Sequence, residues 1–216
     1  MVYTTFQIND EVKTIVEAGA HCGNEALQLQ EKYPDAFVIT YEADPDKWER
    51  IHNKLLGSNI VFRKTGLGAK VEERMFYKFT GYENDGADSF FPRFNGDMSP
   101  KKKVKTTTLE FEMARYNLNT IDLLCMDTQG FEYNILKGLG NRIKDVKNII
   151  LEMPDIRMST DEFKIPEGYD SVYNGAKPSK IIKEFLNKNG FEEVCRKREN
   201  LLEANVHFKK KIYKNV

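Results

Sequence analysis

The sequence predicts an α/β fold with a mainly parallel sheet and helices on both of its faces. Apolar runs alternate with amphipathic stretches along the chain, which is the pattern of that class. One apolar run, 14–18, leads into a turn containing Gly19 and Gly23, and a later run, 121–126, ends in an acidic cluster at Asp127. Such folds bind ligands at the carboxyl ends of their strands. These observations indicate a cofactor-dependent transferase rather than a passive binding module.

The first third of the chain fits two strand–helix units followed by a third strand. After each of the first two apolar runs, apolar residues recur at helical spacing. Pro45 can open the second helix with Asp44 as its cap, and Gly57 is typical of a helix end. The expected strands are 14–18, 36–41 and 60–64, and the expected helices are 24–32 and 46–56.

The remainder of the chain continues the alternation after an irregular interruption. Residues 71–79 alternate loosely and predict an edge strand or a hairpin arm. The segment 81–100 is rich in Gly, Asn, Asp and Pro, which predicts a loop that could serve as a lid. The later elements are a strand-like stretch at 104–109, helices at 110–116, 133–139 and 180–189, strands at 121–126 and 146–153, and an antiparallel pair at 191–196 and 205–210.

Length and composition fit one globular domain, 1–216. Lys+Arg and Asp+Glu each total 33, and a net charge of zero argues against a nucleic-acid partner bound through bulk charge. Three widely spaced cysteines argue against a disulfide framework and favour a reducing compartment, so we expect a cytoplasmic protein. We see no signal-peptide pattern, and no apolar run approaches the roughly 20 residues of a membrane span.

The turn Glu17-Ala-Gly19-Ala-His-Cys-Gly23-Asn24 has the form G-x-x-x-G. Glycines there would let a cofactor lie against the backbone. Glu42 ends the second strand, where a carboxylate can accept hydrogen bonds from both hydroxyls of a ribose. The G-x-G-x-x-G fingerprint is missing, so a cofactor without a pyrophosphate fits better. The alternative is a structural turn with a solvated charge at Glu42.

The segment Asp127-Thr-Gln129-Gly-Phe-Glu132 holds two carboxylates and an amide directly after an apolar strand. One interpretation is a helix start, with Glu132 in the first turn. The other is that Asp127 contacts a substrate hydroxyl, a metal ion or both. Glu152 closes the next strand, so Asp127 and Glu152 could hold a hard divalent cation such as Mg²⁺ or act as a proton acceptor.

Other polar groups leave alternatives open. His21 could act as a base or bind substrate, or it could be a turn histidine bonded to backbone. The lysines 101–103 most often belong to a solvated surface. Aromatic residues in 81–100, including Tyr82, and in 155–177 could wall an acceptor pocket, anchor these loops to the core, or form a dimer contact.

These motifs together resemble the FkbM-type S-adenosylmethionine-dependent O-methyltransferases. The segment 121–138, with Asp127, Glu132 and Gly138, is close to the family pattern I-D-x-x-x-x-D-x-x-G-x-E-x-x-x-L-x-G, and the similarity extends over nearly the whole chain. Gln129 stands where many members carry Glu, Glu17 where Asp is common, and Tyr41-Glu-Ala where Phe-Glu-Pro is usual.

The resemblance implies a Rossmann-like class I methyltransferase fold, with a seven-stranded, mainly parallel sheet and one antiparallel strand. It implies S-adenosylmethionine as the cofactor and a sugar or glycan hydroxyl as the methyl acceptor. Asp127, Glu152 and His21 are the catalytic candidates, and Asp127 with Glu152 the metal candidates. The cofactor-binding candidates are Glu17, Gly19, Ala20, Gly23, Asn24, Glu42, Ala43, Thr65, Gly66, Leu67, Ser89 and Asp127.

Three other functions stay open from the sequence. The protein could be an inactive methyltransferase-like binding protein, or it could methylate a small molecule other than a sugar. A nicotinamide-dependent oxidoreductase fits less well, because the pyrophosphate fingerprint is missing. We expect a small-molecule or glycan substrate and allow for a homodimer.

Overall fold

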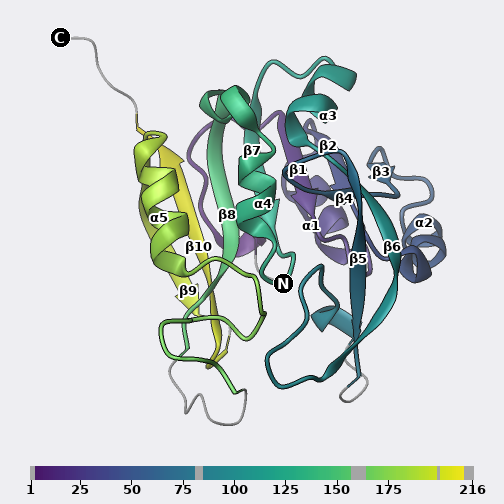
Figure 1. The fold of residues 1–216 in the computed structure, drawn as a ribbon. Coiled ribbons are helices and arrows are strands. Elements are labelled where there is room, and N and C mark those ends of the chain that lie inside the picture. Colours follow the sequence, from purple (N-terminus) through teal and green to yellow (C-terminus); the bar gives the residue numbers. More distant parts are fainter. Residues whose placement is uncertain (1–2, 81–84, 157–163, 199, 212–216) are drawn as a thin grey trace.

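The computed structural model of the protein describes residues 3–80, 85–156, 164–198 and 200–211. The strands of its main sheet are β1 (Thr14–Ala18), β2 (Phe37–Tyr41), β3 (Val61–Arg63), β7 (Ile121–Met126), β8 (Val146–Pro154), β9 (Phe191–Arg198) and β10 (Glu203–Lys210). Their order is β3-β2-β1-β7-β8-β10-β9 (Figure 1). The first five are mutually parallel, and β10 runs antiparallel to both β8 and β9. The expected mainly parallel, seven-stranded sheet with one antiparallel strand is confirmed.

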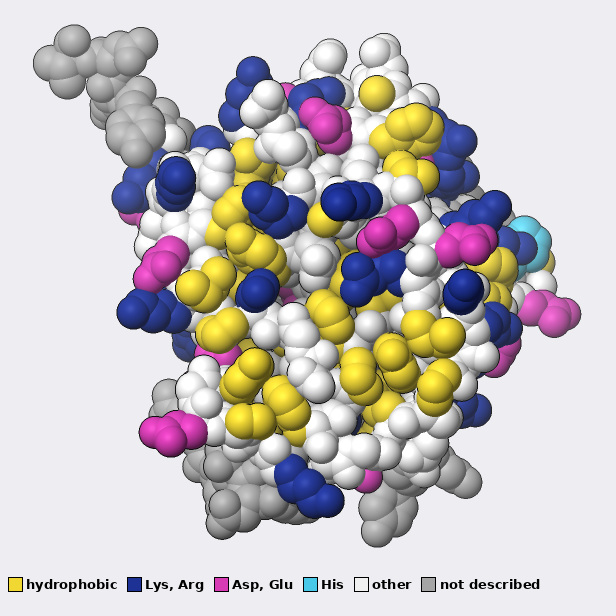
Figure 2. All heavy atoms as spheres, viewed as in Figure 1, with side chains coloured by type: hydrophobic (Ala, Val, Ile, Leu, Met, Phe, Trp, Pro, Cys, Tyr) yellow, Lys and Arg dark blue, Asp and Glu magenta, His cyan; other side chains and the backbone are white. Residues whose placement is uncertain are grey.

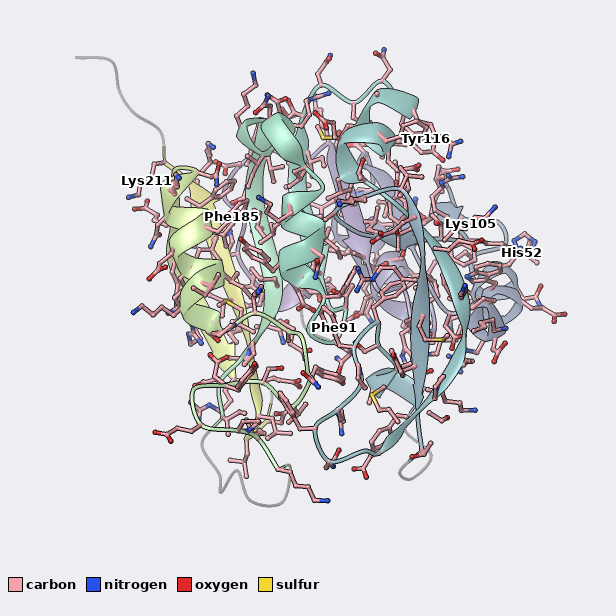
Figure 3. All side chains as sticks on the ribbon, in the orientation of Figure 1. His52, Phe91, Lys105, Tyr116, Phe185 and Lys211 are labelled. Atoms are coloured by element: carbon pink, nitrogen blue, oxygen red, sulfur yellow. The ribbon has the colours of Figure 1, made fainter. Side chains whose placement is uncertain are left out.

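Helices cover both faces of this sheet. They are α1 (Asn24–Lys32), α2 (Trp48–Lys54), α3 (Leu109–Arg115), α4 (Glu132–Lys137) and α5 (Ser179–Lys188), with short 3-10 helices η1 (Tyr3–Thr5), η2 (Pro45–Lys47), η3 (Asp85–Ala87) and η4 (Gly140–Asp145). Helices α4 and α5 lie on the near face in Figure 1, and α1 lies behind the sheet. Phe185 of α5 points toward α4, where its ring packs against Tyr133 (Figure 3). None of the helices in the described ranges is long and apolar enough to span a membrane.

The central strands are apolar on both sides because each side meets a separate core layer. In β7, Leu124 and Met126 belong to the core cluster on the α4 side. Leu123 and Cys125 alternate with them and belong to the opposite cluster. A continuous apolar run is therefore what this position in the sheet requires.

A second, three-stranded sheet interrupts the alternation. Its strands are β4 (Gly66–Leu67), β5 (Glu72–Phe79) and β6 (Met98–Thr107), in the order β4-β6-β5. The segment 71–79 is thus one arm of an antiparallel pair. The expected loop 81–100 ends earlier than its composition suggested, because Met98 already pairs with Phe79. Pro100, which lacks an N–H, is tolerated beside the register shift between Phe76 and Tyr77.

Candidate active site

A pocket lies at the carboxyl ends of β1, β2 and β7, and β4, β5 and the segment around η3 also contribute to its lining. Parallel strands bring their carboxyl ends to one edge of a sheet, so segments distant in sequence meet here. The candidates from the sequence that line this pocket are Gly19, His21, Glu42, Ala43, Thr65, Gly66, Leu67 and Asp127.

Other candidates lie outside the pocket lining, namely Glu17, Ala20, Gly23, Asn24, Ser89 and Glu152. Ala20 is buried in a core cluster with Ile51 and Leu55. Gly23 is the N-cap of α1 with a φ of 78°, and Asn24 is exposed at the first position of that helix. The second half of the glycine turn therefore starts α1 instead of facing the pocket.

Gly19 is required by the packing of two strand ends. Its φ is 97°, and a Cβ added there would lie 1.9 Å from the carbonyl oxygen of Asp127. The backbone nitrogen of Asp127 donates to the carbonyl of Ala18 at 3.0 Å, which holds the ends of β1 and β7 together. Any side chain at Gly19 would separate these ends and move Asp127.

Glu42 is a buried carboxylate held by backbone donors. Its Oε2 accepts the N–H of His21 at 2.8 Å, and its Oε1 accepts the N–H of Asp44 at 2.7 Å. Burial raises the pKa of Glu42, while Lys47 and the backbone donors oppose that rise. His21 has a φ of 50°, so the turn bends its backbone N–H toward Glu42. The two loops that follow β1 and β2 are locked together through this one side chain.

Aromatic rings form one wall of the pocket. The ring centroid of Phe90 lies 4.7 Å from that of Phe131 and 5.1 Å from that of Phe76. All three residues line the pocket, yet they come from β5, the η3 segment and the turn before α4. Aromatic residues in three unrelated segments gave no joint signal in the sequence.

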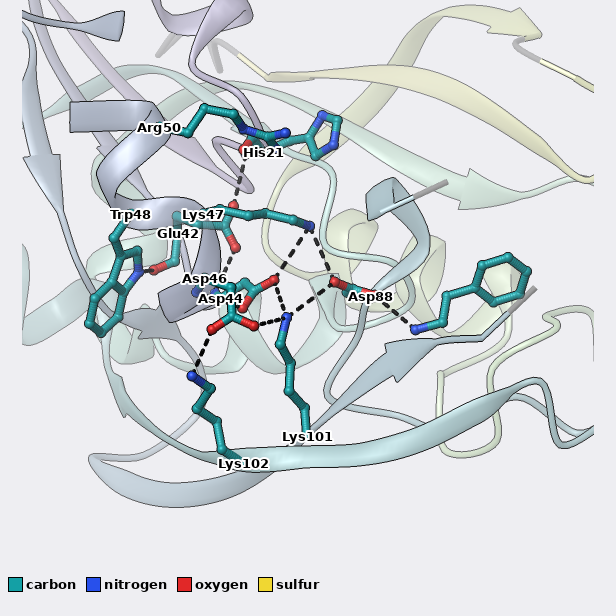
Figure 4. A network of polar contacts seen from close by, with 11 residues as sticks. His21, Glu42, Asp44, Asp46, Lys47, Trp48, Arg50, Asp88, Lys101 and Lys102 are labelled. Carbon is teal, nitrogen blue, oxygen red and sulfur yellow. Dashed lines mark hydrogen bonds and ion pairs between the residues drawn. The ribbon is translucent and has the colours of Figure 1, made fainter. Parts of the chain in front are cut away.

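A network of buried charges joins the β5–β6 hairpin to the end of β2 (Figure 4). Lys101 of β6 contacts Asp44 at 2.7 Å, Asp46 at 3.0 Å and Asp88 at 3.8 Å. Lys47 contacts Asp88 at 3.4 Å and Asp44 at 3.8 Å. The Lys101 side chain is 9% exposed, so the expectation of a solvated surface lysine is wrong at this position. Lys101 is the extra residue at the register shift of β6, because Pro100 pairs with Tyr77 and Lys102 with Phe76, and such a bulge redirects a side chain.

Glu17 lies behind the pocket in the interior of the sheet. It is fully buried, and Thr40 donates its hydroxyl to Oε2. Its Oε1 has no hydrogen-bond partner among the described residues. Burial raises the pKa of Glu17 to about 8, so the group is mostly protonated at neutral pH.

Asp127 and Glu152 end neighbouring parallel strands, as their sequence positions predicted. Gln129 bridges them, because its Nε2 donates to Asp127 Oδ1 at 2.7 Å and to Glu152 Oε2 at 2.9 Å. Burial and the neighbouring Asp127 raise the pKa of Glu152 well above its usual range. Gln129 lines the pocket beside Asp127 and was not among the candidates from the sequence.

Glu132 has the helix-start role that was one interpretation of this cluster. Its Oε1 accepts both the N–H of Thr128, at 2.8 Å, and the hydroxyl of Thr128, at 2.9 Å. Ser89, expected near the cofactor, donates its hydroxyl to the carbonyl of Gln129 at 2.7 Å. Both residues hold the loop that carries Gln129.

The expected metal site finds no support in the arrangement of donors. No group of three or more His, Cys, Asp or Glu side chains within the described ranges is arranged to hold a metal ion. Asp127 and Glu152 are close, but the amide nitrogen of Gln129 bridges them. An N–H donor repels a cation, so these residues as placed do not fit a bridging divalent ion.

Comparison with known proteins agrees with the fold. The profile of the methyltransferase FkbM domain matches residues 17–192. Methyltransferase 1 of Beauveria bassiana (strain ARSEF 2860) is 23% identical over 163 residues, which is 65% of this chain and 64% of that protein. The crystal structure of methyltransferase FkbM from Methylobacillus flagellatus KT matches with a TM-score of 0.59 and 12% identity, covering 96% of this chain and 46% of that one.

This chain spans less than two thirds of the length of either of these two proteins. The FkbM domain profile nevertheless covers most of the chain, from the end of β1 to the start of β9. The chain therefore belongs to the FkbM methyltransferase family.

Proposed function

We propose that the protein is an S-adenosylmethionine-dependent O-methyltransferase that acts on a hydroxyl of a sugar or glycan. The observation that carries the proposal is that Glu42 and Asp127, from the ends of two different strands, line one pocket with Gly19 between them. The pocket therefore offers the Glu42 carboxylate to a ribose and the Asp127 carboxylate to an acceptor hydroxyl. Membership in the family supports the transferase chemistry.

The lining of the pocket fits S-adenosylmethionine. Glu42 would accept hydrogen bonds from the ribose hydroxyls, because two backbone donors fix its carboxylate and each oxygen retains a further lone pair. Leu67 and Phe90 offer apolar surface to the adenine, and Gly19 and Asp127 would lie at the methionine end. When bound, the cofactor supplies a methyl group already activated by a positively charged sulfur.

Asp127 would orient the acceptor and take its proton. Asp127 would hold the acceptor hydroxyl toward the activated methyl group of the bound cofactor, would take the proton that the oxygen loses on methylation, and would pass that proton to solvent. In-line placement of the two reacting atoms supplies much of the rate. His21 also lines the pocket and is the second candidate for contact with the acceptor.

The acceptor class is proposed from the surface beside the pocket. Apolar side chains gather on the near face over the lower part of the β5–β6 hairpin and around the neighbouring Phe91 (Figures 2 and 3). The rings of Phe94 and Tyr169 lie 5.1 Å apart, and Tyr169 is 46% exposed. Aromatic faces of this kind can stack on sugar rings, and nearby carboxylates can bind the hydroxyls. Tyr82 lies outside the described residues.

The cofactor assignment is tested by calorimetry with S-adenosylhomocysteine. We expect Glu42→Ala to weaken binding about 10- to 100-fold, the effect of losing hydrogen bonds to a charged group. Glu49→Ala, at an exposed position on α2, is the matched control and should bind normally. Equal affinity of Glu42→Ala and the native protein would refute the ribose assignment.

The acceptor assignment needs a separate assay. We would offer labelled cofactor with a panel of monosaccharides, oligosaccharides and glycosides, and locate the product methyl by NMR. Transfer to a sugar hydroxyl is the expected result. Labelling of a protein side chain or a nucleic acid, with every sugar inert, would refute the sugar acceptor and leave the cofactor assignment standing.

A further inference from the structure

The side chain of Gln129 lies where two carboxyl groups converge at the edge of the sheet. Its single amide nitrogen is 2.7 Å from Asp127 Oδ1 and 2.9 Å from Glu152 Oε2. An amide –NH₂ group carries two protons, so it can donate to both oxygens at once. Asp127 lines the pocket, whereas Glu152 lies behind it, so Gln129 connects the pocket to a buried acid.

The orientation of this amide is fixed by its other end. The hydroxyl of Tyr173 donates to Gln129 Oε1 at 2.5 Å, and the carbonyl of Ala87 is farther from that hydroxyl at 3.2 Å. Arg93 Nη2 donates to the same Tyr173 oxygen at 3.3 Å, which leaves the tyrosine proton for Gln129. A flipped amide would place its oxygen against two carboxyl groups. The –NH₂ therefore faces Asp127 and Glu152.

The backbone also holds Gln129 in an unusual position. Its φ is 54° and that of Gly130 is 92°, so both residues adopt the left-handed region. A residue other than glycine pays a conformational cost there, and such strain persists only where surrounding contacts enforce it. Ser89 supplies one of these contacts through its bond to the Gln129 carbonyl. The loop is thus shaped to deliver this one side chain between the acids.

We propose that Gln129 is a positioning residue that takes the place of a bridging cation and aims the Asp127 carboxylate into the pocket. Divalent ions hold carboxylate oxygens at about 2.0–2.6 Å, and here the amide nitrogen occupies that central place with longer contacts. The methyl transfer by this chain therefore requires no divalent ion at Asp127 and Glu152. The inference rests on the proposed function for its catalytic part only.

The direct test exchanges the amide for a carboxylate and measures cation binding by calorimetry. Gln129→Glu removes both N–H donors and places a third carboxylate between Asp127 and Glu152. We expect the native protein to show no binding of Ca²⁺, Mg²⁺ or Mn²⁺ at this site, and Gln129→Glu to gain it. Gln7→Glu adds the same charge at an exposed position and should gain none. Equal cation binding by the native protein and Gln129→Glu would overturn the inference.

Turnover and cofactor binding give the second test. Gln129→Leu removes the bridge without adding charge, and we expect kcat to fall about 10- to 100-fold from misplacement of Asp127. Its circular dichroism should match that of the native protein, and its affinity for S-adenosylhomocysteine should change much less than its kcat, which separates positioning from misfolding. An unchanged kcat in Gln129→Leu, or loss of native activity in EDTA that Mg²⁺ restores, would overturn the inference.

The proposed methyl transfer and the proposed role of Gln129 can fail independently. If the native protein binds S-adenosylhomocysteine but transfers methyl to no acceptor, the proposed reaction fails. The calorimetry on Gln129→Glu still decides whether the amide occupies a cation position, because it needs no turnover.

Discussion

The two sides of the pocket hold their acidic side chains by different means. On the hairpin side, the carboxylates of Asp44 and Asp88 face the ammonium group of Lys101. On the side of β7 and β8, the carboxyl groups of Asp127 and Glu152 share the neutral amide of Gln129. The first arrangement adds positive charge to the interior, and the second adds only hydrogen-bond donors.

The pKa shifts follow this difference only at the rim of the ion network, because burial raises the pKa of Asp88 within it. Lys102 and Lys101 lower the pKa of Asp46, at the rim of the ion network, to about 2. Burial and the charge of Asp127 raise the pKa of Glu152. The ion pairs of Lys101 and Lys47 join the hairpin to the end of β2, whereas the amide bridge joins two strand ends without adding charge. We therefore expect the hairpin side to contribute mainly to stability, and the side of β7 and β8 to contribute to the proposed reaction.

The largest expected effect concerns Asp127, on the side of β7 and β8. Asp127→Asn keeps an oxygen that can accept from Gln129 but removes the proton acceptor. We expect kcat to fall about 10²- to 10⁴-fold, the usual contribution of a general base, with little change in thermal stability. A methyl-transfer assay and a melting curve check this. A variant that melts far below the native protein yet retains its kcat would reverse the roles assigned to the two sides.

The next largest expected effect concerns Lys101, on the hairpin side. Lys101→Met removes one of the two lysines that contact Asp44 and Asp88. We expect a loss of about 3 kcal/mol in the free energy of unfolding, because Asp44 loses its contact at 2.7 Å and only Lys47 remains near the two buried carboxylates. Lys102→Met is the matched control, since its side chain is 41% exposed and its ion pair with Asp46 should contribute at most about 1 kcal/mol. Urea unfolding of both variants measures the contrast. Equal losses would show that burial of Lys101 does not matter.

The smallest expected effect concerns Glu17, a buried acid that is bonded neither to a lysine nor to an amide side chain. The pKa of Glu17 rises from 4.5 to about 8 on burial, so the folded protein retains a proton that the unfolded chain releases. The contribution of Glu17 to stability is therefore complete below about pH 4.5 and is lost as the pH rises through about 8. The slope approaches about 1.4 kcal/mol per pH unit within that window, or about 2 kcal/mol from pH 6 to pH 8.

Glu17→Gln should remove this pH dependence, because the amide cannot ionise. Denaturant unfolding at pH 6, 7 and 8 gives the slope for the native protein and the variant. Glu31→Gln, at an exposed position of α1, should leave the native slope unchanged. A native slope that persists in Glu17→Gln would assign the titration to another buried acid.

The succession of strands along the chain and the edge that holds the pocket followed from local patterns. A continuous apolar run such as 121–126 predicts a strand buried on both faces, and a polar residue directly after it lies at the strand's carboxyl end. Glu42 and Asp127 were identified in this way, and both line the pocket. The same patterns identified a glycine turn but could not tell which glycine faces the pocket. That distinction depends on Gly23 starting α1 while Gly19 meets Asp127.

The sequence by itself thus determined the fold class and the edge of the sheet that holds the pocket, because burial and strand polarity leave periodic traces in neighbouring residues, while the motif at 121–138 indicated the family by resemblance. Only the tertiary structure decided which side chains contact the acids there. Lys101 meets Asp44 across 57 positions of the chain, and Tyr173 meets Gln129 across 44. The residues next to a lysine in a basic run, or next to a glutamine after a strand, do not indicate such a distant partner. Their roles arise because folding brings those partners within hydrogen-bond distance.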